Sequence, residues 1–164
     1  MKNLICIISG EPNSINSEII GKVLKMKKKL RRQNFFIIGN YKLIKKQFEQ
    51  LKYNIKLKKI TKIENNNFAK NNFVLDVPLT FKNPFKVSIK NKKSYIINCF
   101  KIAIDLAKKK KVAGFINCPI NKFETFGLRT IGITEFLAKK EKVLGKEAML
   151  IYNKSLSVSP ITTH

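Results

Sequence analysis

Short apolar runs alternate with amphipathic segments along residues 1–60 of the chain. Leu4–Ser9 and Phe35–Ile38 are apolar runs of the kind that form strands buried on both faces. Leu43–Leu51 is a lysine-rich segment with apolar residues at helical spacing, and Ile55–Ile60 reads as a third strand. With a helix expected from Ser17, the order is strand–helix–strand–helix–strand, which favours a parallel sheet with helices on its faces.

The pattern also predicts where helices begin and end. Ser17 is expected to be an N-cap, because its hydroxyl suits the free N–H groups of a first turn and Glu18 follows it. Apolar positions from Tyr95 to Ala107 form one stripe that ends in a run of lysines, which suits the negative end of a helix dipole. Thr134 is expected to cap a later helix whose apolar positions extend to Leu144.

The stretch from Glu64 to Lys93 breaks this regularity. It is rich in asparagine, holds one short apolar run at Phe73–Leu75, and contains Pro78 and Pro84. A loop with a hairpin fits this pattern best, and such a hairpin is a candidate arm for subunit contact.

The C-terminal part returns to strands. Val112–Asn117 is a buried run, and two closing strands are expected at Ala148–Tyr152 and Leu156–Thr162, with Asn153–Ser155 as a hairpin turn. The predicted fold is therefore α/β: a mostly parallel, three-layer αβα sheet with a closing hairpin.

The formal net charge of +24 allows two interpretations. One is an anionic partner such as nucleic acid, a membrane surface or a phosphorylated substrate. The other is compositional, because lysine, asparagine and isoleucine are all frequent and the lysines are scattered along every element. Arginine, the residue that reads guanine edges, occurs only at Arg31, Arg32 and Arg129. The scattered pattern favours the compositional interpretation, so no specific nucleic-acid partner is expected.

The cysteines indicate a reducing compartment. Cys6, Cys99 and Cys118 are widely spaced and odd in number, which favours reduced thiols over a zinc module or a disulfide framework. No apolar run reaches the ~18–20 residues of a membrane helix, and the start of the chain does not resemble a signal peptide. The expected location is the cytoplasm, with no membrane partner.

Three loops follow predicted strands, where ligands bind in open α/β sheets: Gly10–Asn16, Asn117–Lys122 and Thr162–His164. The first has neither the spacing of a dinucleotide-binding loop nor that of a P-loop, so an ordinary strand-to-helix turn is the stronger interpretation. His164 is the single histidine, and an imidazole serves as a base or a metal ligand. A lone histidine is also often structural, and a catalytic metal usually needs three protein ligands.

Four fragments, in this order along the chain, resemble motifs of one enzyme family. Ser9–Ile20 is similar to an opening G-E-P-A-G-I-G-P-E motif, and Asn117–Lys122 to an A-P-I-N-K loop. Gly132–Ala138 resembles G-H-T-E-x-L-A, and Thr162–His164 matches T-T-H. Together they resemble 4-hydroxythreonine-4-phosphate dehydrogenase, an enzyme of vitamin B6 synthesis. The resemblance covers the whole chain, but only about the first half of a family member.

The resemblance implies an oxidoreductase. Residues 1–164 would form a single α/β region like the N-terminal half of a two-domain dehydrogenase, related to isocitrate and isopropylmalate dehydrogenases. The family oxidises 4-phosphohydroxy-L-threonine, a small phosphorylated amino acid, with NAD or NADP, on the route to pyridoxal 5′-phosphate. Members are homodimers that use a divalent metal such as Zn, Mg or Co. The fragment is expected to be inactive on its own.

The resemblance also assigns residues. His164 corresponds to one of three metal-binding histidines, and Thr134 to a substrate-binding threonine. Ile133 stands where the family has a substrate-binding histidine, and Asn16 and Ser17 replace a glycine and a proline of the first loop. No catalytic residue is assigned, and no cofactor-binding residue is expected in this half. Two alternatives stay open: a basic nucleic-acid-binding domain, and a degenerate family member without catalysis.

Overall fold

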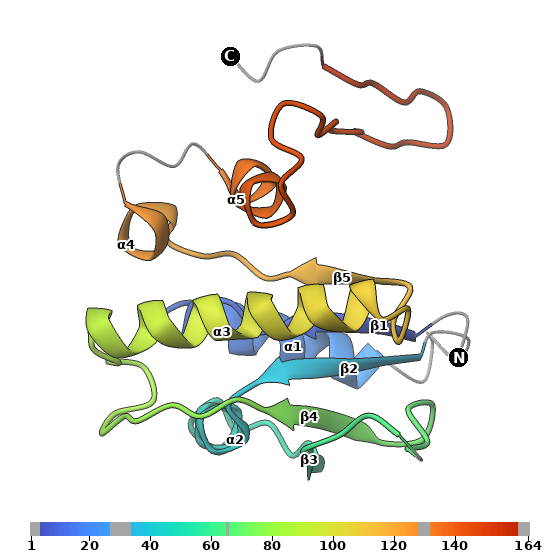
Figure 1. Ribbon diagram of the computed structural model, residues 1–164. Coiled ribbons are helices and arrows are strands. Elements are labelled where there is room, and N and C mark those ends of the chain that lie inside the picture. Colours follow the sequence, from blue (N-terminus) through green and yellow to red (C-terminus); the bar gives the residue numbers. More distant parts are fainter. Residues whose placement is uncertain (1–3, 27–33, 65, 128–131, 161–164) are drawn as a thin grey trace. The chain divides into compact units, whose positions relative to one another are not determined.

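The computed structural model describes residues 4–26, 34–64, 66–127 and 132–160. The chain divides into two compact units, Met1–Asn121 and Lys122–His164, and each is described by itself. Figure 1 gives the element labels used below. None of the helices in these ranges is long and apolar enough to cross a membrane.

The first unit contains an all-parallel sheet whose order is β3-β4-β2-β1-β5. Its described strands are β1 (Leu4–Ile8), β2 (Asn34–Gly39), β3 (Leu57–Ile60), β4 (Asn72–Asp76) and β5 (Gly114–Asn117). The predicted α/β class with a parallel sheet is confirmed. All five carboxyl ends therefore lie along one edge of the sheet.

Three helices connect these strands: α1 (Asn16–Met26), α2 (Tyr41–Gln50) and α3 (Ile89–Lys108). Figure 1 shows α3 in front of the sheet and α1 behind it. Parallel connections are right-handed, so the chain must change faces when the sheet grows in the opposite direction. Here β1, β2 and β3 are placed in one direction through α1 and α2, and β4 then fills the position between β3 and β2. Helix α3 returns across β2 and β1 to β5.

Strand β4 corrects the interpretation of the middle of the chain. The apolar run Phe73–Leu75 is a parallel strand between β3 and β2, and all three residues are buried. Phe68, from the Asn-rich segment before it, packs its ring 5.4 Å from that of Phe36 and 5.3 Å from that of Phe73. The prediction of a hairpin arm was wrong because a short central strand needs few residues when its neighbours supply the core.

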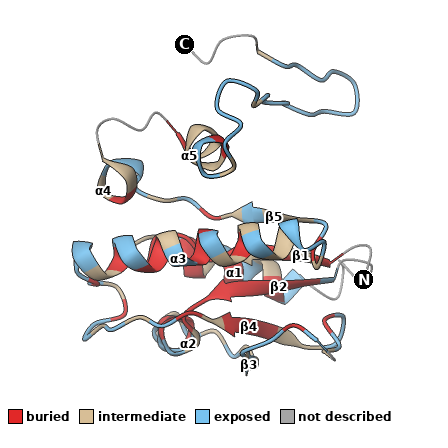
Figure 2. Ribbon diagram, viewed as in Figure 1, coloured by how far each residue is buried: buried red, intermediate tan, exposed pale blue. Residues whose placement is uncertain are grey.

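The core of the first unit lies on both faces of the sheet, where α1 and α2 pack with Ile20 and Ile44 on one face and α3 packs on the other. Figure 2 shows the buried residues concentrated on β1, β2 and β4 and along one side of α3. Tyr95, Ile96, Cys99, Phe100 and Ala103 form the buried side of α3, as the predicted stripe required. The helix begins earlier than the stripe, at Ile89, because the Ser88 hydroxyl caps it by accepting a hydrogen bond from Asn91 N (3.4 Å).

Two predicted N-caps are wrong. Ser17 lies inside the first turn of α1, where the Ser14 hydroxyl accepts from Asn16 N (3.3 Å). Thr134 is the second residue of the helix whose N-cap is Gly132. That helix ends at Lys140, and Leu144 lies beyond it, 62% exposed. A capping hydroxyl is useful at several neighbouring positions, so sequence alone places helix ends only to within a few residues.

The second unit holds α4 (Lys122–Phe126) and α5 (Ile133–Lys140), joined by stacked rings of Phe126 and Phe136 whose centroids lie 4.4 Å apart. The closing strands are reduced to one antiparallel bridge between Ile151 and Val158. The turn between them is as predicted, since Ser155 N donates to Asn153 Oδ1 (2.9 Å).

Candidate active site at the strand ends

The loop after β1 and the loop after β5 lie against each other. Asn16 Nδ2 donates to the carbonyl of Pro119 (2.7 Å), and Glu11 N donates to the same carbonyl (3.1 Å). The parallel pairing of β1 and β5 brings the loops together, and it continues through the bond from Cys118 N to Ile8 O (3.0 Å). Two of the three predicted strand-end loops are thus adjacent.

Gly10 makes this close approach possible. Its φ of +72° lies in the left-handed region that disfavours side chains. A Cβ on Gly10 would lie 2.5 Å from Asn16 Nδ2 and 2.6 Å from the Pro119 carbonyl oxygen. Both the backbone conformation and the space therefore require glycine at this position.

Side chains from several elements hold the β1 loop in one conformation. Asn13 exchanges two hydrogen bonds with the backbone of Val87, at 2.9 and 2.8 Å. Gln47 of α2 donates from Nε2 to the carbonyls of Pro12 (2.8 Å) and Pro84 (2.7 Å), and accepts from Ser17 Oγ (2.8 Å). Such a loop is preorganised, which suits a site that must present backbone groups to a ligand.

A buried ion pair joins the same loop to α3. Lys92 Nζ lies 2.9 Å from Glu11 Oε1, and both side chains are less than a tenth exposed. Among the described residues, neither Glu11 Oε2 nor Asn16 Oδ1 has a hydrogen-bond partner. Buried ion pairs add little net stability, so this one is better explained by the geometry that it imposes on the loop.

The Tyr95 hydroxyl links the ends of three strands. It shares a hydrogen bond with Ser9 Oγ at the end of β1 (2.7 Å) and accepts from Asn40 N after β2 (2.9 Å). Asn40 in turn donates to the carbonyl of Val77 after β4 (2.9 Å) and accepts from Leu43 N, which caps α2. Burial, reinforced by the neighbouring Cys99, raises the pKa of Tyr95 well above its usual value, so the phenol is neutral.

Sequence reasoning did not single out Lys92, Tyr95 or Gln47. Lys92 belongs to a lysine-rich stretch in which every lysine looks solvent-exposed, and Tyr95 belongs to an apolar stripe that predicts only packing. Their polar partners are distant in the sequence, so no local spacing identifies them. For Tyr95, the available signal is that a buried phenol needs a hydrogen-bond partner.

The predicted substrate-binding residues lie in the first turn of α5. Ile133 and Thr134 are its first two residues and are partly buried. Gly132, the N-cap, offers no side chain, so the backbone N–H groups of this turn are not capped by it. Backbone N–H groups of a helix first turn and a threonine hydroxyl are groups that bind anions. The carboxylate of Glu135 also lies beside Gly132 at this turn. The Ile133 side chain has no hydrogen-bonding group, so it cannot replace a histidine.

The predicted metal ligand, His164, lies outside the described residues, as do Thr162 and Thr163. Within the described ranges, no three histidine, cysteine or acidic side chains are grouped so that they could hold a metal ion. Because the sequence has a single histidine, this chain by itself does not fit a three-histidine centre.

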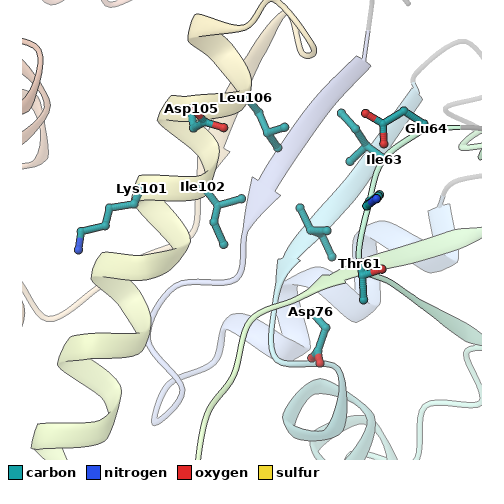
Figure 3. Close-up of a pocket in the computed structure, with 10 residues that line it drawn as sticks. Thr61, Ile63, Glu64, Asp76, Lys101, Ile102, Asp105 and Leu106 are labelled. Carbon is teal, nitrogen blue, oxygen red and sulfur yellow. The ribbon is translucent and has the colours of Figure 1, made fainter.

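A cavity of about 680 Å³ lies away from these loops. Figure 3 shows it between α3, which contributes Ile102 and Asp105, and the segment after β3, which contributes Ile63. In sheets of this kind helices cover both faces. Helix α3, which lines this cavity, packs mainly on β1, β2 and β5 in the described part of the chain. The cavity contains none of the family motifs.

The thiols are not nucleophiles. Cys6, Cys99 and Cys118 are all free and buried. Burial raises the pKa of Cys6 and Cys99 to about 12 and that of Cys118 to about 11. Thiolates are therefore rare at neutral pH, and covalent catalysis by cysteine has no support here.

Taken together, the parallel sheet and its fixed strand-end loops define an α/β protein of the kind that binds ligands at its strand ends. A family model described as pyridoxal phosphate biosynthetic protein PdxA matches residues 31–164. The chain belongs to this family, and the resemblance found in its sequence motifs is confirmed.

Known relatives agree with this assignment. The chain is 30% identical to a 4-hydroxythreonine-4-phosphate dehydrogenase from Sulfurihydrogenibium sp. (strain YO3AOP1), over 98% of the chain and 49% of that protein. Solved structures of the enzymes from Burkholderia phymatum and Klebsiella pneumoniae share the fold. The first has a TM-score of 0.85 at 22% identity, over 100% of the chain and 51% of the other protein. The second has a TM-score of 0.79 at 24% identity, over 96% and 50%. The chain thus spans about half the length of these relatives.

Proposed function

We propose that this chain supplies the N-terminal half of a 4-hydroxythreonine-4-phosphate dehydrogenase. The reaction is oxidation of the hydroxyl of 4-phosphohydroxy-L-threonine by NAD or NADP, on the route to pyridoxal 5′-phosphate. The family match over residues 31–164 carries this proposal. The fixed loops after β1 and β5 support it, because they form a rigid strand-end surface of the kind that a small substrate needs.

Thr134 is the proposed substrate-binding residue. Its hydroxyl and the backbone N–H groups of the α5 first turn would donate hydrogen bonds to an anionic group of the substrate. Ile133 gives no such bond, so substrate affinity should be weaker than with a histidine at this position. The nicotinamide cofactor would bind mainly to residues outside this half, and the expected homodimer and cytoplasmic location stay predictions.

His164 is the proposed contribution of this chain to a Zn, Mg or Co site. A divalent metal polarises the oxygen of a forming carbonyl when it is bound. The residues of this chain do not by themselves complete such a site, so no step of the reaction is assigned to it here. The protein's own part of the mechanism is to orient the substrate through Thr134 and to hold the strand-end loops rigid.

Substrate titration tests the proposal. The chain is titrated calorimetrically with 4-phosphohydroxy-L-threonine and with 4-hydroxy-L-threonine, which lacks the phosphate. Tighter binding of the phosphorylated compound is expected, and Thr134→Val should weaken it by about tenfold, as loss of one hydrogen bond to a charged group does. Ile133→His should strengthen it, whereas the matched control Ile133→Val should not. Equal affinity for both compounds in all variants would contradict the proposal.

A further inference from the structure

Two buried oxygen atoms at the start of α1 and in the loop before it have no hydrogen-bond donor in the described part of the chain. They are Glu11 Oε2 and Asn16 Oδ1. Glu11 is 6% exposed and Asn16 is 2% exposed, so bulk water does not reach these atoms. A buried acceptor without a donor has lost its hydration without replacing it, which is unfavourable. The two oxygens therefore require a donor from elsewhere.

The side-chain donors around these oxygens are already used. Both hydrogens of Asn16 Nδ2 go to backbone carbonyls, those of Glu11 (3.3 Å) and Pro119 (2.7 Å). Both hydrogens of Gln47 Nε2 go to two further carbonyls, and the Ser17 hydroxyl donates to Gln47 Oε1 (2.8 Å). A side-chain amide has two hydrogens and a hydroxyl has one, so these groups have none left to donate. The missing donor is not one of these side chains.

A small cavity lies at this place. Its volume is about 10 Å³, and Glu11, Asn16, Ser17 and Gln47 line it, with Ile20 among its apolar residues. This is about the space that one water molecule occupies. Apolar cavities stay dry, but a cavity that offers two or more polar partners holds water. The volume excludes any larger ligand.

We propose that this cavity binds one water molecule, which donates hydrogen bonds to Asn16 Oδ1 and Glu11 Oε2. A water molecule has two hydrogens, and the two oxygens need two donors. The water would complete a chain of polar contacts from Lys92 through Glu11 and Asn16 to the Pro119 carbonyl. It would thereby link α3 to the loop after β5. Asn16 stands where the family motif has glycine, so this acceptor comes from a departure of the chain from the motif.

A cation fits this cavity less well than water does. The charge of Glu11 is already balanced by Lys92, whose Nζ lies 2.9 Å from Glu11 Oε1, so the cavity has no surplus negative charge. Divalent cations such as Mg²⁺ and Ca²⁺ need six or more oxygen ligands. The described residues offer here only two side-chain oxygens that are not already engaged, those of Glu11 and Asn16. Two acceptors suit a donor with two hydrogens.

A high-resolution crystal structure of the 164-residue chain tests the proposal. We expect solvent density within about 3.2 Å of both Glu11 Oε2 and Asn16 Oδ1. In solution, magnetic relaxation dispersion of water counts the water molecules that stay bound for longer than the protein tumbles. Asn16→Leu replaces the amide by an apolar group of similar shape and should lower this count by one. The matched control Asn13→Leu breaks two hydrogen bonds of the same loop but does not line the cavity, so the count should not change.

Three results would overturn the proposal. The first is the absence of solvent density at this position in the natural chain. The second is an anomalous signal there in crystals soaked in rubidium chloride, which would identify a monovalent cation as the occupant. The third is an equal count of bound waters in the natural chain and the Asn16→Leu variant. The first two need only the natural chain, so the proposal is tested even if Asn16→Leu does not fold. Neither readout involves substrate, so failure of the proposed function would leave this water site standing.

Discussion

The carboxylate of Glu11 and the ammonium of Lys92 lie 2.9 Å apart, and both are buried. Glu11 belongs to the loop after β1, and Lys92 lies one turn into α3. The pair therefore fixes the distance between a strand end and the helix that returns across the sheet. Because each charge is removed from water, neither is tolerated without the other.

Removing one partner of the Glu11–Lys92 pair should therefore lower the free energy of unfolding more than removing both. Lys92→Met leaves a buried, unpaired carboxylate and should lower the free energy of unfolding by about 3–5 kcal/mol. The double variant Glu11→Gln/Lys92→Met should recover most of that loss, which denaturant titrations of all four proteins will measure. Lys22→Met, which breaks the exposed pair with Glu18 (2.7 Å), is the control and should change little. If the loss of unfolding free energy in the double variant equals the sum of the losses in the two single variants, the two charges are not coupled.

The hydroxyl of Tyr95 should contribute to the free energy of unfolding through its hydrogen bonds, in addition to the packing of the ring. Tyr95→Phe keeps the ring but leaves Asn40 N without its acceptor in a buried place, so we expect a loss of about 1–3 kcal/mol in the free energy of unfolding. Tyr152→Phe is the matched control, because Tyr152 is 73% exposed and the same change there should stay within about 0.5 kcal/mol. Equal effects at the two positions would contradict the proposed link between strand ends.

The sheet was largely predictable because three of its described strands, β1, β2 and β5, lie in short, mostly apolar runs. Leu4–Ser9, Phe35–Ile38 and Val112–Asn117 all correspond to observed strands. Strand β4 was missed because its run is short and stands between asparagines and a proline. Its identity depends on burial between β3 and β2, which is a property of the folded sheet and not of the segment.

The site was predictable only in part. The placement of loops at strand ends follows from topology, and the contact of Asn16 with Pro119 agrees with it. The ties that fix the β1 loop were not predictable, because Lys92, Tyr95 and Gln47 approach it from helices far along the chain. Assigning Thr134 required the family motif, since a threonine in the first turn of a helix by itself indicates only a cap.

Gly10 should tolerate substitution far less well than another glycine of similar conformation. Gly10 and Gly145 have φ values of +72° and +83°, so alanine is strained at both by about 1–2 kcal/mol. A Cβ on Gly10 also meets the Pro119 carbonyl oxygen at 2.6 Å, whereas one on Gly145 meets no described atom within 4 Å. Thermal unfolding should therefore show a clearly larger loss for Gly10→Ala than for Gly145→Ala. Similar melting temperatures of the Gly10→Ala and Gly145→Ala variants would mean that the loops after β1 and β5 are not in close contact.

Stability should fall at alkaline pH because of the buried thiols. Burial raises the pKa of Cys6 from 9.0 to about 12, so the folded state holds its proton over a range in which the unfolded chain releases it. The stabilising contribution is therefore complete below pH 9.0 and is lost as the pH rises towards about 12. Cys6→Ala removes this contribution, so the stability difference between the natural chain and the variant should shrink from about pH 8 to about pH 10.5 in denaturant titrations.

Rapid reaction of the folded chain's thiols with a disulfide reagent near pH 8 would contradict this account. The unfolded chain, with its pKa of 9.0, is the positive control because it has about a thousandfold more thiolate at Cys6.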